Sequence, residues 1–237
     1  MFILAKKATV QQNYNEVPET LTNHPFYGLK LDKEQIAFRD AIWDPEKLIV
    51  FCNAKAGTGK SLIATATANL LVQYGRYNGI VYIASPTQEQ KQGFLTGNIQ
   101  EKSDPYFEPF YQALETIGIN TYSALIDNVI NQKNGTGYIQ CMTHTFLRGC
   151  NFENKVIILD ESQNFYVDEM KKVLTRIHDS CKTIVIGHSG QVDLYSHPEN
   201  SGFIRYLNHF KDDERCAVCE LTHNHRGWIS SWADELK

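Results

Sequence analysis

The stretch Ala54–Ser61 places small residues, a lysine and a hydroxyl in an order suited to holding phosphate. It reads Ala-Lys-Ala-Gly-Thr-Gly-Lys-Ser and nearly matches the pattern G-x-x-x-x-G-K-[ST]. Glycines in such a loop let successive backbone N–H groups turn toward an anion, and a following helix points its positive end at the same place. The residues predicted to bind nucleotide phosphates are Ala56, Gly57, Thr58, Gly59, Lys60 and Ser61.

Two side chains of this loop have distinct predicted roles. Lys60 is expected to reach the β and γ phosphates, and the Ser61 hydroxyl to ligate Mg²⁺, so the predicted cofactors are ATP and Mg²⁺. Ala54 stands where the pattern has its first glycine. Its methyl group is tolerable where φ is negative and distorts the loop entry otherwise. The alternative is a glycine-rich turn without ligand, but packing alone does not explain Gly-Lys-Ser at this place.

A second acidic motif follows an apolar run. Residues 155–159 (Lys-Val-Ile-Ile-Leu) lead into Asp160 and Glu161. A carboxylate at that strand tip holds Mg²⁺ in phosphate-loop proteins, usually through water, and Asp160 is assigned this role. Glu161 is expected to face the γ-phosphate and to orient or deprotonate the attacking water. Asp-Glu after a strand is often only a solvated strand end, but the phosphate loop elsewhere in the chain weighs against that interpretation.

Gln191 follows a third strand-like run, Thr183–Ile186, across a polar turn. A glutamine there is suited to sensing the γ-phosphate by hydrogen bonding. The alternative, a loop glutamine that bonds only backbone or water, stays open at this point.

The elements that must position these residues alternate along the chain. Apolar, β-branched runs predict strands, and the segments between them have helical spacing, which indicates a mainly parallel sheet covered by helices. The expected strands are Leu48–Cys52, Ile80–Ala84, Tyr138–Met142, Val156–Leu159, Thr183–Ile186 and Cys216–Leu221. One expected helix begins at Asp32 and ends before Pro45. The others span Ser61–Tyr74, Asp104–Glu115, Tyr122–Asn131, Asp168–His178 and about Trp228–Leu236. The class is three-layer α/β, with an N-terminal arm at 1–30 and a single domain at 31–237.

Composition sets outer limits on function. The chain has 237 residues, a net charge of −4 and 21% charged residues. No polybasic tail binds nucleic acid on charge alone, and no apolar run predicts a signal peptide or membrane span. We therefore expect a cytoplasmic protein with reduced cysteines. Cys216 and Cys219, followed by His223 and His225, suggest zinc, but strand residues three apart point to opposite faces, which favours ordinary packing.

Together these motifs resemble the PhoH-like proteins, P-loop ATPases with a RecA-like core related to superfamily 1 helicases. The resemblance runs from about residue 28 onward and fits a short, divergent member such as one from a phage. Besides Ala54–Ser61, its carriers are Gly93–Gly97, Gln100–Lys102, Asp104–Tyr106, Phe146–Gly149, Ile158–Asn164 and Gly187–Leu194. The resemblance implies ATP hydrolysis, a homo-oligomeric ring such as a hexamer, and single-stranded RNA as partner. It also implies that Gln35 lies on the adenine side and that Arg226 is the family's C-terminal arginine.

Several positions depart from the family pattern. Ser85 replaces an arginine, His188 an aspartate and Gly190 a serine, and the turn Arg226–Trp228 lacks the usual His-Pro. Arg226 is interpreted as an arginine finger in its own or a neighbouring site; the alternative is a helix-start arginine on a solvated surface. Two other function classes remain: a nucleotide-dependent assembly module with little turnover, and a small-molecule kinase, which the absence of an evident acceptor lid disfavours.

Overall fold

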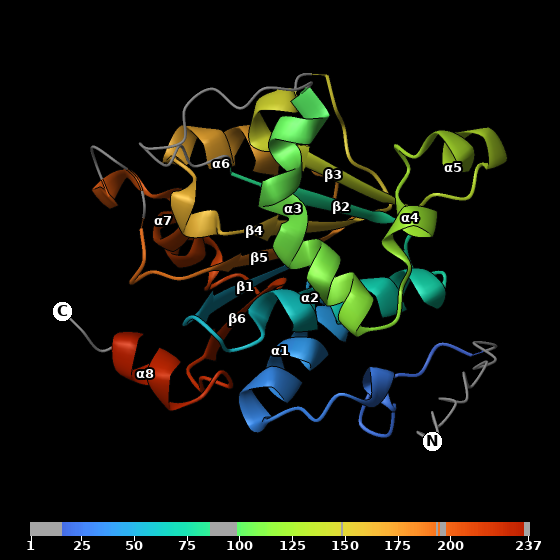
Figure 1. Ribbon diagram of the computed structural model, residues 1–237. Coiled ribbons are helices and arrows are strands. Elements are labelled where there is room, and N and C mark those ends of the chain that lie inside the picture. Colours follow the sequence, from blue (N-terminus) through green and yellow to red (C-terminus); the bar gives the residue numbers. More distant parts are fainter. Residues whose placement is uncertain (1–15, 86–98, 148, 193, 195–197, 235–237) are drawn as a thin grey trace.

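A six-stranded, all-parallel sheet forms the centre of the computed structural model, which describes residues 16–85, 99–147, 149–192, 194 and 198–234 (Figure 1). The strand order is β3-β2-β4-β5-β1-β6. The strands are β1 (Ile49–Ala54), β2 (Ile80–Ala84), β3 (Ile139–Thr143), β4 (Val156–Asp160), β5 (Lys182–Gly187) and β6 (Cys216–Leu221). The predicted three-layer α/β class is confirmed.

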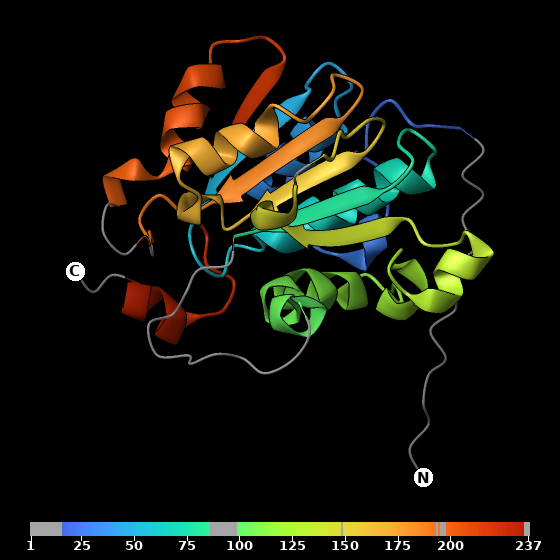
Figure 2. The same cartoon turned by 90° about the horizontal axis from the view of Figure 1, so that it is seen from above.

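Helices cover both faces of this sheet, as Figure 2 shows from above. They are α1 (Lys33–Trp43), α2 (Lys60–Gln73), α3 (Ile99–Thr116), α4 (Thr121–Ala124), α5 (Val129–Asn134), α6 (Val167–Leu174), α7 (Gly202–Phe210) and α8 (Trp228–Asp234). Helices α1, α2 and α3 share one apolar core with one face of the sheet, whereas α6 and α7 share a second core with the other face.

The strands alternate between these two cores. In β1, Val50 and Cys52 face the α1–α3 side, and Ile49 and Phe51 face the α6–α7 side. Every residue of β2, β4 and β5 is buried. Because both faces are covered, these runs are apolar except at strand ends such as Asp160 and Lys182, and this explains why they are recognisable in the sequence.

The sheet order brings the two predicted motifs to one edge. β5 lies between β4 and β1, and all strands run in the same direction, so their carboxyl ends meet. The phosphate loop leaves β1 at this edge, and Asp160 ends β4 there, beside Ala84 of β2. Ligands of open parallel sheets bind outside these carboxyl ends.

Three sequence-based element assignments need correction. The single helix expected over Tyr122–Asn131 is wrong: the chain forms the short helices α4 and α5, each begun by an asparagine that accepts backbone N–H bonds (Asn120 and Asn128). The helix expected from Asp104 begins at Ile99 instead. The helix expected to reach His178 ends at Leu174, and α7 was not anticipated.

Residues before α1 pack against it. Leu21 and Phe26 are buried in the same core as Phe38 of α1, and the Trp43 indole donates to the Pro18 carbonyl.

Candidate nucleotide-binding site

The phosphate loop has the backbone shape that an anion cradle needs. Gly57 and Gly59 have φ of 74° and 80°, in the left-handed region that side chains disfavour, and Gly59 is the N-cap of α2. A Cβ on Gly57 would lie 2.6 Å from Asn224 Oδ1, and one on Gly59 would lie 3.0 Å from Gln35 Nε2. Both glycines are therefore required by backbone conformation and by neighbouring side chains.

Ala54 does not disturb this loop. It is the last residue of β1, paired with Leu221 of β6, and it is buried in the core. An extended residue accepts a methyl group without strain, so the departure from glycine is compatible with the loop.

Asp160 is held at the tip of β4 by three hydrogen bonds. Its Oδ2 accepts from the Ser61 hydroxyl at 2.7 Å and from the Tyr82 hydroxyl at 2.9 Å, and its Oδ1 accepts from the Glu161 N–H at 2.8 Å. Tyr82 is itself fixed by stacking on Phe110 of α3. Burial, followed by the charge of Glu161, raises the pKa of Asp160, while Lys60 and the Ser61 hydroxyl oppose this effect. The two predicted Mg²⁺ ligands, Ser61 and Asp160, are thus in direct contact.

Glu161 lies against the phosphate loop, although part of its side chain is exposed. Its φ of 49° turns the chain sharply after β4, and its carboxylate pairs with Lys60 Nζ at 3.1 Å. Burial alone would raise the pKa of Glu161, but the Lys60 ammonium and the Gln163 amide outweigh it, so the pKa lies below its usual range. Burial lowers the pKa of Lys60, and the charges of Glu161 and Asp160 reverse this and raise it. Glu161 is accordingly ionised at neutral pH.

Gln163 is a site residue that the sequence did not reveal. It is buried; its Nε2 donates to Glu161 Oε2 at 2.6 Å, and its Oε1 accepts the His188 N–H at 2.9 Å. Gly187 leaves room for it, because a Cβ there would meet the same Oε1 at 3.0 Å. The only available signal was its place two residues after Glu161. Gln163 joins the end of β4 to the loop after β5.

Gln191 lies in that loop, with an exposed side chain. Its N–H donates to the His188 carbonyl at 3.1 Å. The structure brings Gln163, rather than Gln191, into contact with Glu161.

The turn after β6 closes the opposite side of the loop. The His225 N–H donates to the Gly57 carbonyl at 2.9 Å, and the imidazole contacts Asp32 Oδ2 at 2.9 Å. Gln35 is buried, completes the capping box of α1 with Asp32, and donates from Nε2 to the Thr58 carbonyl at 2.9 Å. The predicted base-side residue therefore supports the loop backbone directly.

Arg226 comes from the same turn. Its Cδ lies 3.1 Å from the position that a Cβ on Gly57 would take, and its charge acts on Lys60. The Arg226 side chain is exposed, and it lies beside the phosphate loop of the same chain.

The donor set fits a nucleotide with Mg²⁺. A loop with two left-handed glycines, a lysine, and a hydroxyl bonded to a buried carboxylate supplies N–H groups for phosphate and oxygens for a hard cation. Elsewhere in the described ranges, no group of three His, Cys, Asp or Glu side chains is arranged to hold a metal ion.

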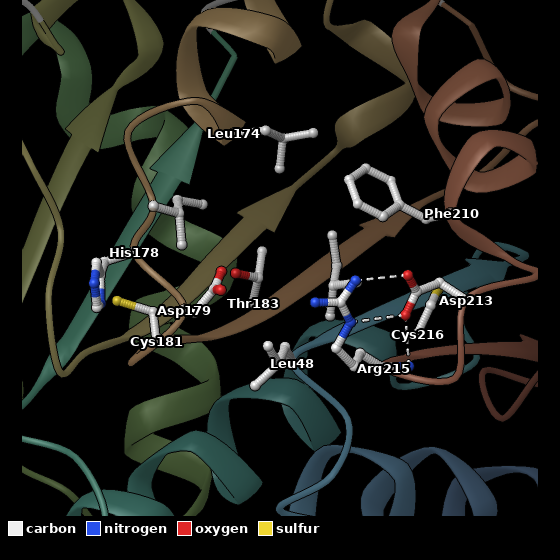
Figure 3. A pocket seen from close by; sticks show the side chains of 12 residues that line it. Leu48, Leu174, His178, Asp179, Cys181, Thr183, Phe210, Asp213, Arg215 and Cys216 are labelled. Atoms are coloured by element: carbon white, nitrogen blue, oxygen red, sulfur yellow. Dashed lines mark hydrogen bonds and ion pairs between the residues drawn. The ribbon is translucent and has the colours of Figure 1, made fainter.

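A separate cavity of about 180 Å³ lies at the opposite edge of the sheet (Figure 3). Its walls include Leu48, Thr183 and Cys216, at the amino-terminal ends of β1, β5 and β6. It also contains the Asp213–Arg215 ion pair. The cavity is remote from the phosphate loop.

Fold and site together define a nucleotide-binding domain of the P-loop class with a RecA-like core. Residues 30–227 match the family described as PhoH-like protein, and the chain belongs to this family. Three parts of the resemblance, Gly93–Gly97, Arg148 and Asp193, lie outside the described residues.

Curated relatives agree with this assignment. The chain is 32% identical over 176 residues to a PhoH-like protein of Mycobacterium tuberculosis (strain ATCC 25618 / H37Rv), covering 73% of this chain and 47% of that protein. It is 31% identical over 194 residues to Protein PhoH of Escherichia coli (strain K12), covering 80% and 52%. The chain thus spans about half the length of these relatives. The large terminase of bacteriophage HK97 shares the fold, with a TM-score of 0.52 and 10% identity over 87% of this chain and 43% of that chain.

In the part of the chain that the structure describes, no helix combines the length and the apolar character needed to cross a membrane.

Proposed function

We propose that this chain is a Mg²⁺-dependent ATPase whose turnover is coupled to single-stranded RNA. The observation that carries the proposal is the convergence of Lys60, Ser61, Asp160 and Glu161 at one edge of the sheet, within hydrogen-bonding contact of one another. These four side chains provide a phosphate ligand, two metal ligands and a carboxylate for water.

Each residue has a task in this proposal. Backbone N–H groups of residues 56–59 and Lys60 bind the phosphates, and Gln35 fixes the loop from the base side. Ser61 and Asp160 hold Mg²⁺, which neutralises charge on the phosphates when bound. Glu161, kept ionised by Lys60 and Gln163, orients the attacking water. Arg226 neutralises developing charge from its own chain, and Gln191 senses the γ-phosphate.

The Lys60–Glu161 ion pair links nucleotide binding to the contacts of Glu161. An ammonium shared with a carboxylate must give up part of that contact to reach phosphate oxygens. Lys60 is only partly exposed, with 16% of its side chain accessible against 46% for Glu161, so it has little room for a second partner. Nucleotide binding therefore frees Glu161 as it engages Lys60.

Coupling to RNA rests on the family to which the chain belongs. Translocation along a strand needs two neighbouring cores, and we expect a homo-oligomeric ring, such as a hexamer, to supply them. The location we propose is cytoplasmic, where RNA and ATP are found.

The test is phosphate release from Mg²⁺-ATP with and without single-stranded RNA, beside Lys60→Ala. Turnover that RNA raises and Lys60→Ala abolishes supports the whole proposal. Turnover indifferent to RNA retains the ATPase and removes the coupling. Tight ATP binding without turnover overturns the enzyme and indicates a nucleotide-dependent assembly module.

A further inference from the structure

Helix α8 presents its apolar side chains to solvent. Trp228, Ile229 and Trp232 are 73%, 78% and 65% exposed. The polar residues Ser230 and Ser231 are the partly buried ones. The two indoles lie one helical turn apart with ring centroids 6.3 Å apart and planes 26° from parallel. An amphipathic helix normally buries its apolar face, so this reversed arrangement indicates a surface that a ligand covers.

One residue links α8 to the phosphate loop. Asn224 Nδ2 donates to Ser230 Oγ at 2.8 Å, and Asn224 Oδ1 accepts the Arg226 N–H at 2.8 Å. The same Oδ1 fills the space beside Gly57, 2.6 Å from where a Cβ would lie. Figure 1 shows α8 following β6 on the edge of the sheet that carries the loop. A single residue, Asn224, would therefore lie between a ligand on α8 and the nucleotide site.

The carboxylates beside the turn that leads into α8 already have partners in that turn: Asp32 contacts the His225 imidazole, and Glu34 accepts the Thr222 N–H. Two cations there do not: Lys55 opens the phosphate loop and Arg226 lies two residues before the helix, both side chains are exposed, and neither forms an ion pair with another described residue. Aromatic rings beside positive charge are the combination with which proteins hold single-stranded nucleic acid, by stacking bases and meeting phosphates.

We propose that Trp228 and Trp232 form a stacking platform for the bases of a single-stranded nucleic acid, with Lys55 contacting its phosphates. This assignment rests on the nucleic-acid coupling proposed above and gives that coupling a location. Stacking recognises the faces of all bases, so RNA and DNA strands share the chemistry. Asn224 is the joint through which the occupied platform acts on the loop.

The chain offers a built-in probe for this platform. Of its three tryptophans, Trp43 is buried at 2% exposure, so fluorescence quenching by an oligonucleotide reports α8. Uridine and thymidine oligonucleotides are titrated in separate arms, and the affinity of each is also measured by anisotropy of a labelled strand. We expect quenching of the wild type by at least one of them.

Variants then separate stacking from fold. Trp228→Ala and Trp232→Ala are expected to weaken binding roughly 5- to 150-fold each, whereas Trp228→Phe retains most of it. Lys55→Ala should lower the slope of log K against log salt by about 1. Tyr122→Ala is the matched control, because Tyr122 is an aromatic residue 76% exposed on α4. Phosphate release without nucleic acid is expected to stay at the wild-type level in the tryptophan variants and in Tyr122→Ala.

The outcomes are distinct. Binding that is unchanged in both alanine variants overturns the platform and leaves the coupled ATPase standing. An oligomer, seen by sedimentation, that dissociates in the tryptophan variants while their strand affinity holds makes α8 an interface between copies and also overturns the proposal. A wild type that turns over ATP but binds neither strand removes the proposed coupling and the platform together. If the wild-type protein releases no phosphate from ATP without nucleic acid, the ATPase itself is refuted.

Discussion

Replacing Gln163 with leucine should damage catalysis without emptying the nucleotide site. The side chain makes one hydrogen bond to Glu161 and one to the backbone of His188, at 2.6 and 2.9 Å. A hydrogen bond to a charged group contributes about 1.5–3 kcal/mol. At about 1.4 kcal/mol per tenfold, its loss from the carboxylate proposed to orient water should lower kcat by roughly 10- to 150-fold. KM for ATP should change little, because Gln163 does not contact the phosphate loop.

A pH profile distinguishes positioning from mere destabilisation. The Gln163 amide helps to lower the pKa of Glu161, so its removal raises that pKa. Glu161 works as a carboxylate, and activity falls as the pH drops through its pKa. The acid limb of kcat/KM should therefore move to higher pH in Gln163→Leu. A residue with only a structural role would lower kcat without moving this limb.

Two further variants make the experiment decisive. Gln112→Leu removes the same kind of bond, from an exposed Gln112 to Glu108 at 3.0 Å, and should leave kcat and the pH limb unchanged. Gln163→Glu keeps an acceptor for the His188 N–H and, as a carboxylate, has no hydrogen to donate to Glu161, so it tests catalysis if the leucine variant unfolds. A folded Gln163 variant with wild-type kcat and an unmoved acid limb would refute the assignment.

Three other substitutions test the site and its support. Gly57→Ala should abolish ATP binding in calorimetry because its Cβ meets Asn224, whereas Gly75→Ala, with positive φ but open space, should lose only about 1–2 kcal/mol of stability; equal ATP affinities would contradict this. Ser61→Ala should raise the Mg²⁺ concentration for half-maximal turnover at least about tenfold, and an unchanged Mg²⁺ titration would exclude Ser61 as a ligand. Burial lowers the pKa of Lys182 from 10.5 to about 7. Between these two pH values the unfolded chain keeps the Lys182 proton that the folded chain has lost, so the stability against urea should rise from pH 7 toward 8.5. Lys182→Met should flatten that rise relative to wild type.

The sequence predicted where each strand ends better than it predicted which strands lie side by side in the sheet. Runs such as Val156–Leu159 are recognisable because both faces of the sheet are covered, and the polar residues after them stand out against that background. Which strand lies beside which depends on long-range pairing, to which local composition is blind. The position of β5 between β4 and β1 therefore came only from the structure, and with it the contact between Gln163 and the loop after β5.

The split of Tyr122–Asn131 into two helices has a local cause. Asn128 accepts the N–H groups of Ile130 and Asn131, so it starts a new helix where the apolar spacing suggested continuity. The Asn131 side chain then bonds the carbonyls of Tyr122 and Leu125 across the break. Short polar side chains compete with the helix backbone in this way, and a pattern based on apolar periodicity does not register the competition.

The departures at His188 and Gly190 are explained together by sterics. A Cβ on Gly190 would lie 3.1 Å from His188 Nε2, so an imidazole at 188 and a side chain at 190 compete for the same space. The contact that matters to the site is the His188 N–H to Gln163, and a backbone donor is insensitive to the side chain it carries. The pair of changes can therefore accumulate without disturbing Glu161.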